Sequence, residues 1–253
     1  MLFDTHAHYY SRAFSKDRHE LLSSFPEKGV SLVLSPGSDI PTSQVCIDLA
    51  EQYDFFYAAA GVHPQCAGEQ LPSWSQKLEA MLSHPRVKAV GELGLDYYWD
   101  SSPHPVQAAV MRTQMELAQQ FNLPVIVHDR EAHRDCLAIV RDYPDVRGVF
   151  HCYSGSLEDA RVLIKLGYLI SFTGTITFKN ARKAPEVIRG LPLESMMIET
   201  DAPYMAPAPF RGQRCDSTMV YRMAETIAEI KGISYDEVVS VTRENGKRLF
   251  GID

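Results

Sequence analysis

The sequence lacks the features that mark several large classes of protein. Its 253 residues contain no low-complexity tract and no apolar run near the roughly 18 residues that a membrane-spanning helix needs. Its five cysteines are an odd number without a Cys-x-x-Cys pair, which argues against a disulfide framework and favours a reducing compartment. No export signal is visible at the N-terminus, so we expect a cytoplasmic protein with no membrane association.

Positive charge is also scarce. Lysine and arginine together number 25 against 32 aspartates and glutamates, and the formal net charge is -7. A protein that holds long duplex nucleic acid on a broad basic face needs the opposite balance, so any nucleic-acid partner would have to be held locally. The sequence also has no Gly-x-Gly-x-x-Gly motif after its first strand and no phosphate-binding loop, which argues against an open, doubly wound sheet.

Apolar segments that alternate with helical patterns run through the whole chain. Strands are expected at the N-terminus and at 30–34, 55–62, 87–93, 124–128, 148–151, 168–172 and 196–201. Helices are expected at 15–28, 42–52, 74–82, 106–121, 132–142, 156–166, 185–189, 218–231 and 235–249, with fraying or a kink at Asn245-Gly246. Eight strands in such alternation, in a chain of the right length, predict an α/β fold: one (β/α)8 TIM barrel spanning residues 1–253.

Polar side chains stand where these apolar segments give way to loops. Five of the nine histidines and two carboxylates occupy such positions: His6, His8, His63, Glu92, His128, His151 and Asp201. In a (β/α)8 barrel the carboxyl ends of the strands meet at one mouth, so we expect these side chains to converge there.

Imidazole and carboxylate groups together are the ligands that zinc, manganese or iron prefer. The set therefore predicts two divalent cations, with zinc expected and magnesium or manganese as alternatives. We expect Glu92 to bridge the two ions, and Asp201 to complete the first site with His6 and His8. His128 and His151 would hold the second ion. Two ions activate a water molecule for hydrolysis, and Asp201 could take its proton, which makes Glu92 and Asp201 the expected catalytic residues.

With these residues in place, the chain resembles the TatD family of metal-dependent deoxyribonucleases, within the amidohydrolase-like barrels. The likeness covers nearly the whole length. It rests on Phe3-Asp4-Thr5-His6-Ala7-His8, Gly61-Val62-His63-Pro64, Gly91-Glu92-Leu93-Gly94-Leu95-Asp96-Tyr97-Tyr98, Val127-His128, His151-Cys152-Tyr153-Ser154-Gly155, Thr177-Phe178-Lys179-Asn180 and Glu199-Thr200-Asp201-Ala202-Pro203-Tyr204.

The resemblance implies the same six metal ligands: His6, His8, Glu92, His128, His151 and Asp201. It makes His63 a substrate contact, and it implies hydrolysis of phosphodiester bonds in DNA, typically from a 3′ end. The expected partner is single-stranded DNA or a frayed end, and no protein partner is evident. Arg130, Lys179 and Arg211 lie near strand ends and could meet its phosphates. The chain departs from the family at Cys215-Asp216-Ser217, where many members carry Asn-Glu-Pro.

Two other functions remain open at this stage. The same metal centre could serve an amidase, lactonase or esterase that acts on a small molecule. Alternatively, the protein could bind metal without catalysis, although a structural site is usually closed by four ligands and has no need of six.

Overall fold

The computed structural model, which describes residues 1–99 and 101–253, contains one eight-stranded parallel sheet. Each strand pairs with its sequence neighbours, in the order β1 to β8. The strands are β1 (Leu2–Asp4), β2 (Val30–Pro36), β3 (Phe56–Ala60), β4 (Val87–Asp96), β5 (Val125–Arg130), β6 (Gly148–Phe150), β7 (Tyr168–Phe172) and β8 (Met196–Ile198). The predicted (β/α)8 barrel is confirmed, because an open doubly wound sheet would reverse its strand order.

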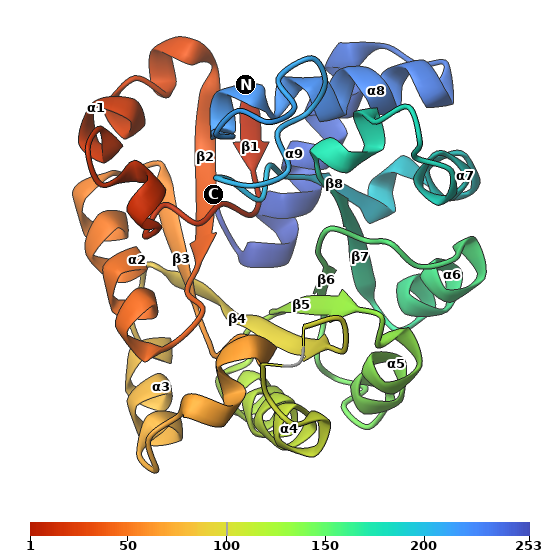
Figure 1. Ribbon diagram of the computed structural model, residues 1–253. Helices are drawn as coiled ribbons and strands as arrows, with labels where there is room; N and C mark the ends of the chain where they lie inside the picture. The colour runs from red at the N-terminus through yellow and green to blue at the C-terminus, as the bar shows by residue number, and fades with distance from the viewer. Residues whose placement is uncertain (100) are drawn as a thin grey trace.

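Helices surround the strands on the outside of the barrel, as Figure 1 shows. They are α1 (Arg18–Ser23), α2 (Ile40–Gln52), α3 (Trp74–Leu82), α4 (His104–Phe121), α5 (His133–Arg141), α6 (Leu157–Lys165), α7 (Lys183–Gly190), α8 (Tyr221–Lys231) and α9 (Tyr235–Phe250). Short 3-10 turns fill the loops at Arg12–Phe14, Pro26–Lys28, Pro64–Glu69, Gly174–Thr177, Leu193–Ser195 and Ser217–Met219. In the part of the chain that the structure describes, no helix is long and apolar enough to cross a membrane.

The seam between β1 and β8 is joined by backbone hydrogen bonds just beyond the ends of the two strands. The amide of Thr5 donates to the carbonyl of Ile198 (3.3 Å), and that of Asp201 donates to the carbonyl of His6 (2.9 Å). The amide of His8 donates to the carbonyl of Ala202 at 2.6 Å. These bonds bring the opening His-x-His segment alongside Asp201.

The two larger hydrophobic cores among the described residues follow from the alternation of side chains along each strand. The larger core packs the outer face of the sheet against the helices. The smaller one gathers inward-facing strand residues with Phe250 and Ile252 from the end of the chain: Phe3, Leu32, Leu34, Ala59, Ala89, Ile126, Val149 and Met197. The barrel interior is therefore packed with side chains, and the cluster of histidines and carboxylates described below rests on a filled interior.

Two helices differ most from the prediction, and the helix expected at 218–231 begins only at Tyr221, after the 3-10 turn Ser217–Met219. The segment 15–28 forms α1 and then a separate 3-10 turn, Pro26–Lys28, because Pro26 cannot donate a backbone hydrogen bond to a continuous helix. Helix α9 runs unbroken through Asn245 and Gly246, where fraying or a kink was expected. The buried Asn245 side chain donates to the carbonyls of Leu193 and Met196, and Gly246 lies against the ring of Phe3, where a Cβ would come within 2.8 Å of the ring. Tertiary contacts thus hold this turn in helical form.

Candidate metal centre

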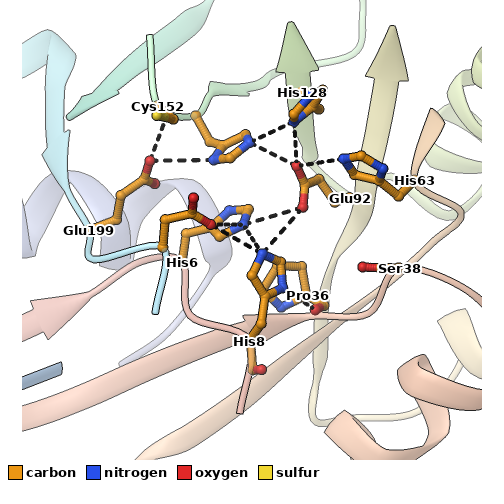
Figure 2. A network of polar contacts seen from close by, with 12 residues as sticks. His6, His8, Pro36, Ser38, His63, Glu92, His128, Cys152 and Glu199 are labelled. Carbon is orange, nitrogen blue, oxygen red and sulfur yellow. Dashed lines mark hydrogen bonds and ion pairs between the residues drawn. The ribbon is translucent and has the colours of Figure 1, made fainter. Parts of the chain in front are cut away.

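The strand-end residues singled out in the sequence meet in one cluster at the mouth of the barrel (Figure 2). They come from β1, β3, β4, β5, β6 and β8. Glu92 and His128 lie within β4 and β5, which extend beyond their predicted ends, and the others lie just beyond the carboxyl ends of their strands. All are largely or fully buried, with Glu92 only 2 % exposed. Asp201 adopts a left-handed backbone conformation (φ 60°), which is unusual for a residue other than glycine and often marks a functional site.

The carboxylate of Glu92 lies between two groups of imidazoles. Its Oε2 is 3.4 Å from Nε2 of His6 and 3.6 Å from Nε2 of His8. Its Oε1 is 2.8 Å from Nδ1 of His128 and 2.8 Å from Nε2 of His151. Each oxygen of one carboxylate therefore faces a different pair of histidines.

Asp201 closes the cluster on the β1 side. Its Oδ1 lies 3.2 Å from Nε2 of His8 and 3.8 Å from Nε2 of His6. Its side chain is 12 % exposed against 2 % for Glu92, so Asp201 is the more exposed of the two carboxylates.

Two carboxylates that the sequence analysis did not assign support the histidines from behind. Asp96 Oδ2 lies 3.2 Å from Nε2 of His128, on the side of the ring opposite Glu92. Glu199 Oε1 lies 3.5 Å from Nδ1 of His151 and accepts a hydrogen bond from the amide of Cys152 at 2.6 Å. Both residues stand inside the quoted family motifs, but their partners lie on other strands, so no local pattern pointed to their role.

A buried polar network fixes the ends of β1 and β8. Asp4 accepts hydrogen bonds from the Thr200 amide (2.9 Å), from the Thr200 hydroxyl (2.6 Å) and from the Ser217 hydroxyl (2.6 Å). The amide of Ser217 donates to the Tyr9 hydroxyl at 2.8 Å, a bond that proline could not make. Asp216 caps the short turn that follows by accepting from the amide of Thr218. The departure from the family sequence therefore adds polar contacts close to the cluster.

Interactions between carboxylates and imidazoles together outweigh burial in setting the pKa values of three groups in this cluster. Burial alone would raise the pKa of Glu92, but the imidazoles around it, His151 foremost, hold that pKa well below its usual range. Burial would lower the pKa of His151, yet the Glu92 and Glu199 carboxylates raise it well above normal. The pKa of His128 is raised in the same way, since Asp96 and Glu92 outweigh burial. A nitrogen must lose its proton before it can bind a metal, so acid pH should oppose metal binding.

The donor set fits divalent metal cations. A buried carboxylate is costly unless positive charge compensates it, and imidazole with carboxylate is the combination that zinc, manganese and iron accept. Within the described residues, three groups place one ligand atom per residue within 4.8 Å of one another: His6 with His8 and Glu92, His63 with Glu92 and His128, and His6 with His151 and Glu199. Residues from both sides of Glu92 could thus hold an ion.

A cavity of about 520 Å³ opens above the cluster. Its walls include His63 and Arg130 together with aromatic side chains, whereas Lys179 and Arg211 do not line it. The last two are exposed on the adjacent loops after β7 and β8, where the Arg211 guanidinium lies 4.4 Å from the centre of the Phe178 ring. A second cavity, of about 570 Å³, lies at the opposite end of the barrel and contains none of the predicted site residues.

Known proteins match this chain over its full length. The family model described as TatD related DNase matches residues 3–251. The uncharacterised metal-dependent hydrolase YabD of Bacillus subtilis (strain 168) is 42 % identical over 258 residues, which cover 100 % of both chains. The 3′-5′ ssDNA/RNA exonuclease TatD of Erwinia tasmaniensis is 30 % identical, covering 99 % of this chain and 100 % of its own. The crystal structure of YjjV, a TatD homologue from Escherichia coli K12, superposes with a TM-score of 0.94 at 33 % identity, covering 100 % of this chain and 98 % of its own.

Proposed function

Because the chain belongs to the TatD family of metal-dependent hydrolases, we propose that it hydrolyses phosphodiester bonds in DNA with two divalent cations and a metal-activated water. The proposed substrate is a single strand or a frayed end, degraded from its 3′ terminus. The relative from Erwinia tasmaniensis, whose name carries that polarity, supports this direction of digestion.

The division of the ligands around Glu92 carries the proposal. One carboxylate oxygen faces His6 and His8, with Asp201 beside them, and the other faces His128 and His151. This arrangement supports one cation on each side of a bridging carboxylate. When bound, two such ions would lower the pKa of a water molecule toward about 7 and stabilise negative charge on the attacked phosphate.

Asp201 is the proposed proton acceptor. Burial alone would raise the pKa of Asp201, but the hydrogen bond with His8 and the charge of that ring hold the pKa below its usual value, so the group is ionised at neutral pH. Its partial exposure to the cavity places it where a water molecule can approach.

His63 is the proposed donor to a phosphate oxygen. Burial lowers the pKa of His63 to about 3, so its ring is neutral at physiological pH. Its Nδ1 accepts a hydrogen bond from the amide of Gln65 at 3.1 Å, which leaves the proton on Nε2. That nitrogen lies 3.5 Å from Glu92 and lines the cavity, so its N–H can orient the substrate.

Three positively charged side chains are proposed to hold phosphates at increasing distance from the scissile bond. Arg130 lines the cavity and would meet a phosphate close to the scissile bond. Lys179 and Arg211, exposed on the loops beside the mouth, would meet phosphates further along the strand.

Degradation of oligonucleotides labelled at either end, measured together with the metal content of the purified protein, tests this function. We expect metal-dependent release of nucleotides from the 3′ end of single strands, and less from blunt duplexes. Parallel arms with RNA and with carboxylic ester, lactone and amide reporters define the bond that is cut. Turnover of an ester, lactone or amide without cleavage of DNA would assign the centre to a small-molecule hydrolase, and metal binding without any turnover would contradict catalysis.

A further inference from the structure

Two large aromatic side chains stand exposed at the walls of the catalytic cavity. The side chains of Trp99 and Tyr204 are 51 % and 58 % exposed, although rings of this size are usually well buried. Both line the cavity above the metal cluster. They are therefore exposed at the place where a substrate must enter.

The two rings approach the mouth from opposite sides. Trp99 follows β4 and Tyr204 follows β8, and in a barrel with strand order β1 to β8 these two strands are diametrically opposed. The ring of Tyr204 lies near the cluster itself, with its centre 6.4 Å from that of His8. A flat group that enters the cavity would thus meet an aromatic surface on either side.

A positive charge is fixed beside the first of these rings. The guanidinium of Arg130 lies 4.0 Å from the centre of the Tyr98 ring and 5.8 Å from that of Trp99. The rings of Tyr98 and Trp99 contact each other edge to face at 5.0 Å. An aromatic surface next to an arginine matches the two parts of a nucleotide, because the base can stack and the phosphate can pair with the guanidinium.

We propose that Trp99 and Tyr204 form a nucleobase-binding subsite, which stacks the unpaired bases on either side of the scissile bond. This inference rests on the proposed hydrolysis of DNA and specifies how the strand is held. A base is free to enter between such rings only when it is unpaired, so the subsite favours single strands and frayed ends. Every base has a flat face, so the subsite tolerates any sequence.

Removing the base and removing the ring should then have the same effect. Binding is measured with a fluorescent oligodeoxynucleotide in chelator, where no cleavage occurs, and with a matched strand whose last two residues are abasic. Loss of one stacking contact weakens binding about 5- to 150-fold, so we expect the parent protein to bind the abasic strand, which lacks two bases, more weakly by at least that factor. Trp99→Ala and Tyr204→Ala should each lose one stacking contact with the intact strand and so discriminate less than the parent, and the double alanine variant should bind both strands with the same weak affinity. Trp99→Phe and Tyr204→Phe should restore most of the difference.

Tyr235→Ala, which removes an exposed aromatic ring from the start of α9, is the matched control and should behave as the parent. Metal content should be unchanged in all variants. If both alanine variants still discriminate between the strands as the parent does, or if the parent does not discriminate, the subsite is refuted even when DNA is cleaved. If the parent discriminates through these rings but never cleaves DNA, the proposed reaction fails and the subsite stands.

Discussion

Replacing Glu199 by glutamine tests whether this carboxylate strengthens metal binding by His151. The side chain is 1 % exposed, accepts a hydrogen bond from the Cys152 amide, and lies at ion-pair distance from His151. Glutamine has nearly the same shape and keeps an oxygen that can accept from the amide. The substitution therefore removes the charge behind His151 and little else.

The change should weaken both metal binding and the metal-free fold. A carboxylate behind a metal-binding histidine typically contributes 10- to 100-fold in metal affinity or activity, about 1.4–2.7 kcal/mol. We expect Glu199→Gln to weaken metal binding by that factor. The metal-free protein should also lose stability, because Glu199 is one of the two carboxylates that pair with His151 and raise its pKa, and removing one partner of a buried pair is destabilising.

Competition with a chelating dye would measure the metal affinity, and thermal unfolding without metal would measure the stability. Glu194→Gln, which neutralises an exposed carboxylate just before the other end of β8, serves as the control and should change neither. Unchanged metal affinity in Glu199→Gln would refute the reasoning. The metal affinities are compared at a temperature at which both proteins are folded, so that a loss of stability alone cannot appear as weaker binding.

Three further changes test other parts of the centre. Asp201→Asn should retain part of the metal but lower kcat by at least about 10² at near-normal KM, because the proton acceptor is lost; a changed KM with normal kcat would contradict this. Lys179→Ala should weaken binding to single-stranded DNA and reduce the magnitude of the slope of log affinity against log salt by about 0.7. Lys165→Ala on α6 is the control. An unchanged slope would show that Lys179 does not contact a phosphate. His133 lies 2.7 Å from Asp129, which raises the pKa of His133 above 6.5. The stability that this pair contributes is therefore complete below about pH 6.5 and lost as pH rises through the raised pKa of His133. The difference in Tm between the parent and His133→Gln should shrink above neutral pH. A constant difference would exclude the ion pair.

The sequence predicted the fold well because buried parallel strands are short, continuous apolar runs. The strand at 168–172 and the helix at 74–82 were placed with their observed bounds. The errors arose where distant residues decide local structure. Helix α9 continues through Asn245 and Gly246 only because Asn245 bonds to carbonyls around β8 and Gly246 fits against Phe3. Such contacts leave no local pattern.

The candidate site could likewise be predicted in part, since some of its residues follow from local sequence and others depend on distant contacts. Residues at strand ends could be expected to converge because the fold itself brings them together, and the structure does group His6, His8, Glu92, His128, His151 and Asp201. Their supporting partners could not be found in this way. Asp96 contacts His128 because β4 extends beyond its predicted end and pairs in register with β5. That register is a property of the folded sheet.

A metal ion bound near the seam between the first and last strands would also stabilise the fold. Thr5 and Ile198, which bond across it, are 193 residues apart in the sequence, and the ligand candidates His6 and Asp201 lie beside them. An ion held by both would act as a reversible cross-link between the two ends of the sheet. Since such an ion binds only the closed ring of strands, each hundredfold excess of metal over its dissociation constant would stabilise closure by about 2.7 kcal/mol. Chelation would then loosen the first and last strands before the rest of the barrel. Metal binding would in turn depend on the pairing of these two strands.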